Sequence, residues 1–244
     1  MAPAGLEIDM LFSFLRQIVA RGLVERLSAS LIHGVGASIL QTVGALVIML
    51  SLAAPASAQQ RPARIVALGD SLSAGYLLPE KNAFPTVLER ALRERGYKVE
   101  VSNAGVSGDT ASGGLERLDW AIGDGADLVI VELGANDMLR GVDPAITRKA
   151  LATILAQLQS RKIPMLLAGM VAAPGMGRDY EAAFNAIYPD LSREFSVPLY
   201  PFFLEGVAGH PALQLPDGMH PAPQGVETIV RGILPSVEAL LPPK

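Results

Sequence analysis

Short apolar runs alternate with longer amphipathic stretches from Gln59 onward, and this alternation constrains the fold more than any other feature of the sequence. The runs are rich in Val, Ile and Leu and have the length of strands, while the stretches between them have the length of helices, a pattern typical of βαβ units. A segment such as DLVIVELG has a continuous apolar run, LVIV, rather than alternating character, as expected for a parallel strand covered by helices on both faces. The sequence therefore predicts an α/β fold, a three-layer α/β/α sandwich around a mainly parallel, five-stranded sheet.

The same pattern places the individual elements. We expect helices at Phe84–Arg95, from the N-cap Asp143 through Gln159, at Tyr180–Phe195 and at Gln224–Leu241. Asp143 is followed by Pro144, which favours the first position of a helix. We expect strands at Arg64–Leu68, Lys98–Ser102, Leu128–Leu133, Met165–Met170 and, as a short one, near Leu199.

Composition excludes several classes of function. The chain has 244 residues, half of them hydrophobic, which suffices for the core of one domain. The net charge of -4 and the scatter of Lys and Arg provide no basic stripe for nucleic acid. The absence of cysteine excludes disulfides, thiolate metal sites and a cysteine nucleophile.

Residues 1–58 differ from the rest of the chain and predict an export signal. An uncharged segment at 35–52 follows a segment with three arginines, and small residues at Ala56 and Ala58 match a cleavage site. We expect cleavage after Ala58, which gives an exported, periplasmic or secreted protein, without stable membrane insertion, whose single domain is residues 59–244. The alternative is an anchor at residues 35–54, because the uncharged run approaches the ~20 residues that span a bilayer. A start codon assigned too far upstream would explain the long segment before it.

Three predicted strands lead into polar, glycine-rich segments, GDSLSAGY, NAGVSGDT and GANDMLRG. Each segment alone is typical of a turn. The carboxyl ends of parallel strands meet at one crevice, however, where ligands bind in open α/β sheets. Ser71, a glycine at 105 or 108, and Asn136 would meet there. This combination suits a serine that attacks a carbonyl, because backbone N–H groups and an asparagine amide can stabilise the resulting oxyanion.

A serine nucleophile needs a base, and the chain contains only His33, His210 and His220. His33 falls in the export segment. His220 has Asp217 three residues earlier, in DGMHP, a spacing at which a carboxylate can orient the imidazole. We therefore expect His220 to be the base and His210 to be a surface loop residue. The alternative for Asp217 and His220 is a cap and turn before the last helix.

Other chemistries lack their motifs. The chain contains no GxxxxGK[ST], GxGxxG or HExxH segment. Ser73 stands where the second glycine of a GxSxG elbow would be, which disfavours an α/β-hydrolase. Asp70, Asp109 and Asp137 lie beside the three strand exits and could bind a metal, but acids in such positions more often hold turns.

Four blocks resemble those of the SGNH (GDSL) hydrolases, in the same order: GDSLSAGY with Ser71, SGDT with Gly108, GAND with Asn136, and DGMHP with Asp217 and His220. The segments VELGANDMLRG and FNAIYPDLSREFSVPLYPFF resemble a bacterial subgroup, the periplasmic arylesterases and the acyl-CoA thioesterases of the thioesterase I (lysophospholipase L1, protease I) type. The likeness extends from about Arg64 to the C-terminus.

The resemblance implies a flavodoxin-like sandwich that hydrolyses small acyl esters and thioesters through an acyl-enzyme on Ser71. It implies no metal or organic cofactor. It selects Gly108 rather than Gly105, and assigns the oxyanion hole to the Ser71 and Gly108 N–H groups and the Asn136 side chain. We expect a monomer.

The chain has Ala135 and Met138 where that subgroup commonly has glycines, so the substrate groove is expected to differ. Candidate groove residues are Leu77, Leu78, Met138 and the segment from Ala172 to Tyr180. Two alternatives remain at this stage: a non-catalytic lipid- or glycan-binding module on the same fold, and an enzyme that acts on another bond, such as a carbohydrate O-deacetylase or a peptidase.

Overall fold

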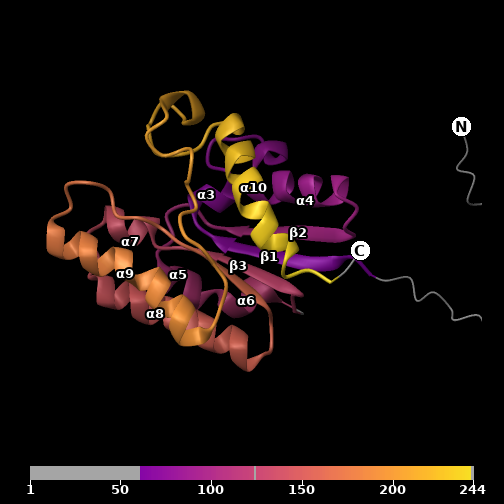
Figure 1. Ribbon diagram of the computed structural model, residues 1–244, viewed down its shortest axis with the longest axis horizontal. Helices are drawn as coiled ribbons and strands as arrows, with labels where there is room; N and C mark the ends of the chain where they lie inside the picture. Colours follow the sequence, from indigo (N-terminus) through magenta and orange to yellow (C-terminus); the bar gives the residue numbers. More distant parts are fainter. Residues whose placement is uncertain (1–60, 124, 243–244) are drawn as a thin grey trace, which may run out of the picture. The chain divides into compact units, whose positions relative to one another are not determined.

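The computed structural model describes residues 61–123 and 125–242, and the expected export signal at 1–58 lies outside these residues. Five parallel strands form one sheet in the order β2-β1-β3-β4-β5 (Figure 1). This confirms the predicted α/β class. The strands are β1 (Ala63–Gly69), β2 (Val99–Gly105), β3 (Leu128–Glu132), β4 (Met165–Ala168) and β5 (Leu199–Tyr200).

The strand bounds differ from the prediction mainly at the carboxyl ends. β2 continues three residues past Ser102, because Asn103–Gly105 pair in register with Ala67–Gly69 of β1. β4 ends at Ala168, before the expected Met170, and its neighbour β5 pairs with it only at Leu167 and Ala168. Pairing with a neighbouring strand, rather than apolar character, therefore decides where each strand ends.

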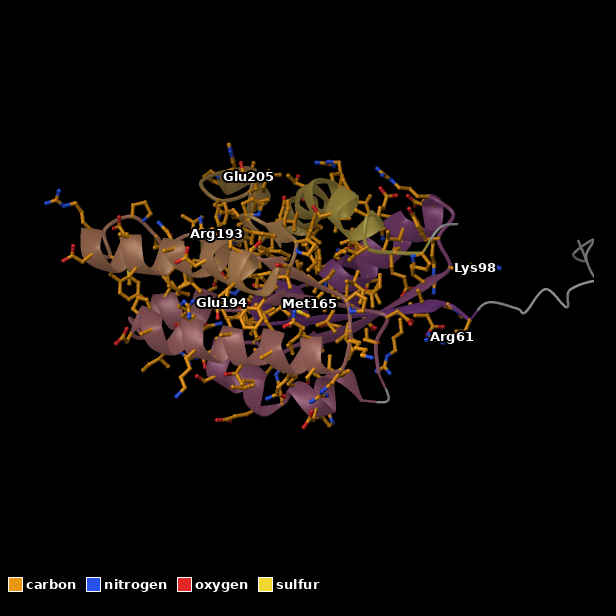
Figure 2. The ribbon with its side chains drawn as sticks, turned by 60° about the horizontal axis from the view of Figure 1, so that its bottom comes forward. Arg61, Lys98, Met165, Arg193, Glu194 and Glu205 are labelled. Carbon is orange, nitrogen blue, oxygen red and sulfur yellow. The ribbon has the colours of Figure 1, made fainter. Side chains whose placement is uncertain are left out.

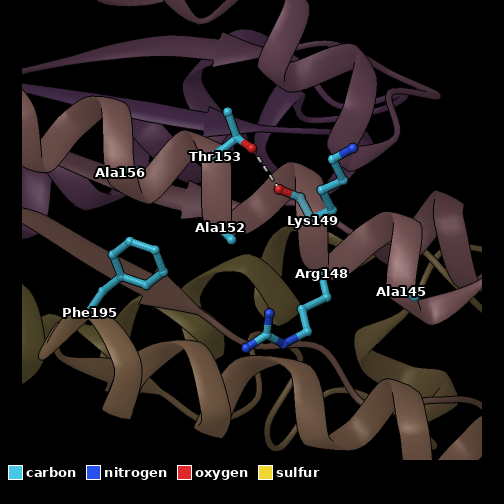
Figure 3. Close-up of a pocket in the computed structure, with 7 residues that line it drawn as sticks. All are labelled: Ala145, Arg148, Lys149, Ala152, Thr153, Ala156 and Phe195. Atoms are coloured by element: carbon cyan, nitrogen blue, oxygen red, sulfur yellow. Dashed lines mark hydrogen bonds between the residues drawn. The ribbon is translucent and has the colours of Figure 1, made fainter.

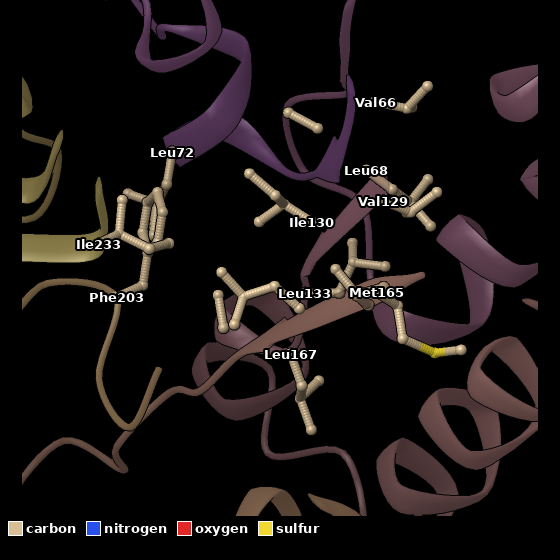
Figure 4. Packing of buried hydrophobic residues seen from close by; sticks show 14 of the residues in the cluster. Val66, Leu68, Leu72, Val129, Ile130, Leu133, Met165, Leu167, Phe203 and Ile233 are labelled. Atoms are coloured by element: carbon tan, nitrogen blue, oxygen red, sulfur yellow. The ribbon is translucent and has the colours of Figure 1, made fainter. Parts of the chain in front are cut away.

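Both faces of the sheet are buried at its centre, which explains why β1 and β3 contain continuous apolar runs at Ile65–Leu68 and Leu128–Val131. Val66, Val129 and Met165 are register partners on adjacent strands, so their side chains lie on the same face. Near another part of the sheet, Phe203 and Ile233 gather beside Leu72 (Figure 4). Every residue of β3 is buried, as expected for a strand covered on both sides.

Helices cover the two faces in the arrangement that the βαβ pattern predicts. α4 (Phe84–Glu94) packs against α10 (Pro223–Glu238) on one face, and α8 (Pro144–Ser160) packs between α5 (Ala111–Glu116) and α9 (Arg178–Phe195) on the other (Figure 1). The four expected helices are present, and their ends coincide with the prediction or differ by at most three residues. The sequence did not predict the short elements α3 (Ser71–Ala74), α5, α6 (Leu118–Ile122), α7 (Ala135–Leu139), η1 (Glu80–Asn82) and η2 (Pro211–Leu213).

The order of the strands indicates at which end of the sheet a ligand can bind. Arg61 and Lys98 mark the amino ends of β1 and β2 (Figure 2), where the Ala63 N–H donates to the Lys98 carbonyl. From β1 the chain first adds β2 on one side and then β3 on the other. The order thus reverses between β1 and β3, and a crevice for a ligand forms beyond the carboxyl ends at such a point. Within residues 61–123 and 125–242, no helix is both long enough and apolar enough to span a membrane.

Candidate active site

Ser71 lies directly beyond the carboxyl end of β1, as the first residue of α3. The preceding Asp70 caps this helix, because its carboxylate accepts a hydrogen bond of 2.9 Å from the Leu72 N–H. Asp70 and Leu72 are buried, whereas Ser71 is only partly buried. The cap therefore holds a tight turn that presents the serine at the sheet edge.

His220 and Asp217 approach Ser71 from the loop before α10. The His220 Nε2 atom lies 2.9 Å from Ser71 Oγ, and His220 Nδ1 lies 2.7 Å from Asp217 Oδ2. With Nδ1–H donating to the carboxylate, Nε2 is free to accept the serine proton. The two spacings join the three side chains in one hydrogen-bonded chain.

Asp217 is held as an anion by its own loop. Its Oδ1 atom accepts hydrogen bonds from the backbone N–H groups of Met219 (2.9 Å) and His220 (3.0 Å). Together these contacts lower the pKa of Asp217 to about 2, with the Met219 bond making the largest contribution and the bonds from His220 adding to it against the opposing effect of burial. The carboxylate is therefore ionised throughout the neutral range.

The loop that carries the histidine is fixed by further bonds. The Leu215 N–H donates to the His220 carbonyl at 2.7 Å, and the Gln214 side-chain amide donates to the Gly218 carbonyl at 2.7 Å. The Tyr76 ring lies against the imidazole, with centroids 4.4 Å apart and a tilt of 33°. His220 is thus oriented by contacts on its ring as well as on its backbone.

Hydrogen-bond donors surround the serine. Gly108 has φ +88°, a left-handed conformation that favours glycine, and its carbonyl accepts from Arg140 Nη2 at 2.7 Å. Asn136, in the first turn of α7, donates from Nδ2 to Asp70 Oδ2 at 3.1 Å. Within the described residues, the backbone N–H groups of Ser71 and Gly108 have no acceptor. Unsatisfied donors of this kind suit a developing negative charge.

Gly105, the alternative to Gly108, has a different role. A Cβ atom at this position would lie 2.3 Å from the Ala74 backbone nitrogen. Gly105 therefore allows β2 to pack closely against α3. Gly108 lines the same cavity as Ser71 and Asn136, whereas Gly105 does not.

A cavity of about 800 Å³ opens at Ser71 and His220. Its wall is mostly apolar, and Met138 forms part of it with its sulfur accepting a hydrogen bond from the Ala173 N–H. Beside Met138, the apolar wall includes Leu72, Ala135, Leu139, Met170, Val171, Phe202, Leu204 and Met219.

Three of the expected groove residues lie outside this cavity wall. The Leu77 side chain is 75% exposed, and Leu78 packs partly buried against the core. The Tyr180 hydroxyl donates to the Val142 carbonyl at 3.0 Å. Of the Ala172–Tyr180 segment, only its beginning, at 172–174, lines the cavity.

Several wall residues were not identified from the sequence. Tyr76 and Met219 lie inside the GDSLSAGY and DGMHP blocks, so their proximity to the blocks' key residues was a usable signal. Phe202 and Leu204 follow β5. Neither residue lies near a predicted catalytic residue in the sequence, because it is the order of the strands that brings this loop to the cavity.

Asp109 and Asp137, considered above as metal ligands, and His210, considered as a base, lie in other surroundings. Asp109 forms an ion pair with Arg117, and Asp137 accepts hydrogen bonds from the Ala111 N–H and the Thr147 hydroxyl. His210 is exposed at the start of η2. These aspartates thus hold local structure, as the sequence favoured.

A second hollow, of about 490 Å³, lies on the outer surface of α8 (Figure 3). The Arg148 side chain at this hollow pairs with Glu194, and the Thr153 hydroxyl donates to the Lys149 carbonyl of its own helix. The wall also contains Phe195 and three alanines, so it lacks a histidine or carboxylate to serve as a base. The cavity at Ser71, by contrast, includes His220 in its wall.

Comparison with known proteins gives concordant matches. Residues 67–227 match the model of the GDSL-like lipase/acylhydrolase family. An arylesterase of Vibrio mimicus is 38% identical over 180 residues, which are 73% of this chain and 88% of the relative. The thioesterase 1/protease 1/lysophospholipase L1 of Escherichia coli strain K12 is 42% identical over 158 residues, 64% of this chain and 74% of the relative.

A solved structure shares the fold over most of the chain. The crystal structure of AlinE4, an esterase of the SGNH-hydrolase family, is 45% identical and superposes with a TM-score of 0.63. The match covers 76% of this chain and all of AlinE4.

Proposed function

The chain belongs to the GDSL-like lipase/acylhydrolase family and is a carboxylic ester hydrolase, and we propose that it cleaves acyl esters and thioesters through a covalent acyl-enzyme on Ser71. One observation carries this proposal. Ser71 Oγ, His220 and Asp217 form a chain of hydrogen bonds of 2.9 and 2.7 Å at the mouth of an apolar cavity.

In the first half of the reaction, Ser71 Oγ attacks the carbonyl carbon of the substrate while His220 Nε2 takes the hydroxyl proton. Asp217 stabilises the imidazolium that forms. The carbonyl oxygen becomes an oxyanion, which accepts hydrogen bonds from the Ser71 and Gly108 N–H groups and from Asn136 Nδ2. The tetrahedral intermediate then collapses, the bond to the alcohol or thiol breaks, and His220 gives the leaving group its proton.

In the second half, a water molecule attacks the acyl-enzyme. His220 takes a proton from the water, the same donors stabilise the second oxyanion, and the bond between Ser71 Oγ and the acyl carbon breaks as His220 returns the proton to the serine. The products are a free carboxylic acid and the restored enzyme, so no metal or organic cofactor is needed to balance the reaction.

The cavity supports an acyl substrate with an apolar chain. Its wall is largely aliphatic and aromatic, and the related proteins carry the names arylesterase and thioesterase/lysophospholipase. Ala135 and Met138, which stand where the subgroup commonly has glycines, both line the cavity and reduce its space. We infer that these two side chains help to set the length of the acyl chain.

Replacing the nucleophile tests the proposal. Ser71→Ala is expected to fold but to lose hydrolysis of p-nitrophenyl acyl esters and labelling by a fluorophosphonate. Ser160→Ala, an exposed serine bonded within α8, serves as the matched control and should behave as wild type. Full activity in Ser71→Ala would refute the assignment. A folded wild-type protein that the fluorophosphonate does not label would instead favour a non-catalytic binding module.

We propose further that residues 1–58 are an export signal and that the exported enzyme begins at Gln59 and acts as a monomer without nucleic acid. In support, Arg61–Lys244 form a compact unit by themselves. N-terminal sequencing of protein recovered outside the cytoplasm should begin at Gln59. A start within residues 1–35 would favour the retained anchor, and light scattering after size-exclusion chromatography will report the oligomeric state.

A further inference from the structure

Two carboxyl groups are buried side by side beneath the proposed nucleophile. Asp70 and Glu132 are both fully buried, and Glu132 pairs with Gly69 at the carboxyl ends of β3 and β1. Glu132 Oε2 accepts from the Ser73 hydroxyl at 2.8 Å and from the Asp70 N–H at 3.4 Å. Among the described residues, Glu132 Oε1 has no hydrogen-bond partner. The proposed mechanism uses neither carboxyl group, so their presence there needs an explanation.

The surroundings of Asp70 and Glu132 affect the pKa values of the two carboxyl groups differently. Burial raises the pKa of Glu132 well above its usual value, and the neighbouring Asp70 raises it further. Burial also raises the pKa of Asp70, but hydrogen bonds from the Leu72 N–H and the Asn136 amide oppose this, and the result is about 6. The nearby Asp137 raises and His220 lowers the same pKa. With a pKa of about 6, Asp70 is mostly the anion at neutral pH, whereas burial and the charge of Asp70 oppose ionisation of Glu132.

The anion at Asp70 determines which way the Asn136 amide faces. Asn136 Nδ2 donates one N–H to Asp70 Oδ2, and its second N–H remains available to the cavity that Asn136 lines. A flipped amide would set its carbonyl oxygen against the buried carboxylate, with repulsion in place of a charge-assisted hydrogen bond. The other oxygen of Asp70 accepts from the Leu72 N–H and so fixes the turn that carries Ser71.

We propose that Asp70 is a positioning residue, which holds the Asn136 amide with its free N–H toward the oxyanion while it also fixes the Ser71 turn. This inference rests on the proposed function, because it assigns to Asp70 the placement of two donors that only an acyl-transfer reaction requires. Asp70 touches no substrate and acts only through these two neighbours. Glu132 supports the turn by accepting hydrogen bonds from the Asp70 N–H and the Ser73 hydroxyl.

A double-mutant cycle tests whether Asp70 acts through Asn136. Removing one oxyanion donor costs about 10²- to 10³-fold in kcat, so Asn136→Ala should lose this much with p-nitrophenyl butyrate. Asp70→Asn should lower kcat by at least tenfold with little change in KM, because the donors serve the transition state rather than substrate binding. In the Asn136→Ala background, Asp70→Asn should cost less than threefold more. Asp127→Asn, the same substitution at the amino end of the sheet, should leave kcat unchanged.

The outcomes separate this inference from the proposed function. If Asn136→Ala is slow but Asp70→Asn lowers kcat by the same factor in both backgrounds, or raises KM instead of lowering kcat, the positioning role is wrong and the proposed function stands. If Asn136→Ala retains the wild-type kcat, the assignment of Asn136 as an oxyanion donor is itself refuted. Circular dichroism and thermal unfolding of each variant establish that the compared proteins are folded.

Discussion

The carboxylate of Asp217 and the imidazole of His220 lie on a single short loop, so their spacing of three residues was enough to predict that they pair. Ser71 and Asn136 were also within reach of sequence analysis, because each follows a buried strand. The cavity wall was harder to predict, as Leu77 shows. Its backbone adopts φ +56°, which is uncommon for a residue other than glycine, and its side chain points into solvent. Spacing in the sequence contains no signal for such a conformation.

Replacing Asp217 should separate catalysis from folding. Asp217→Asn keeps the size of the side chain but can present an N–H group to His220 Nδ1, which favours the wrong tautomer of the imidazole. We expect kcat to fall by about 10³- to 10⁴-fold with little change in KM, as in other Ser-His-Asp triads. Asp190→Asn, which removes only an exposed ion pair with Arg193, is the control and should retain wild-type kinetics. A loss below tenfold in Asp217→Asn would contradict the proposed role.

Replacing Met138 should change the preference for acyl-chain length rather than lower kcat for all substrates. Met138→Ala enlarges the cavity, so the ratio of kcat/KM for long over short acyl chains should rise, measured with p-nitrophenyl esters from acetate to palmitate. Ile146→Ala, at an exposed side chain outside the cavity wall, should leave the ratio unchanged. An unchanged ratio in Met138→Ala would show that the acyl chain binds elsewhere.

Among the elements, the long helices and the strands of the core were predicted well because their periodicity extends over many residues. The short helices were missed. α3, α5 and α7 contain only four to six residues, too few to show a helical repeat, and each begins at the turn after a strand. Thr110, whose hydroxyl accepts from the Gly113 N–H, is a capping signal that could have identified α5.

The N-cap of α8 offers a test at this scale. The Asp143 carboxylate accepts a hydrogen bond of 2.9 Å from the Ala145 N–H, and Pro144 follows it. Asp143→Ala should lower the free energy of unfolding by about 1 kcal/mol, measured by urea denaturation, without changing kcat. Thr153→Ala, in the middle of the same helix, removes only a bond to its own helix and should cost less. Equal stability of the two variants would mean that the cap does not contribute.

For the molecule as a whole, the sequence predicted the layers but not the order of the strands. The exits of β2, β1 and β3 meet because these three strands are adjacent in the sheet, in an order that the sequence pattern does not encode. The position of the loop after β5, which supplies Phe202 and Leu204 to the cavity, depends on the same order. Sequence analysis could therefore identify the reactive groups more completely than the surface that selects the substrate.

The buried Glu132 predicts how the stability of the folded domain varies with pH. Its pKa is raised in the folded state, so the folded protein retains a proton that the unfolded chain releases as pH rises above the usual glutamate value. Glu132 therefore lowers stability progressively with rising pH. Glu132→Gln cannot ionise, so its Tm relative to wild type should increase from about pH 4 to about pH 7.5.

A second variant distinguishes this titration from a simple change in packing. Glu132→Ala leaves the Ser73 hydroxyl without its buried acceptor and should have a Tm below that of wild type at both pH values. If the difference in Tm between Glu132→Gln and wild type is the same at both pH values, the glutamate does not change its proton affinity on folding.

The hydrogen bond between Ser71 and His220 joins residues 149 positions apart, and α10 follows directly after the histidine loop. A chain that grows from its amino end thus contains the serine long before it contains the base. Under the proposed mechanism, a polypeptide that stops before the histidine loop has Ser71 without its base, and we expect it not to hydrolyse esters.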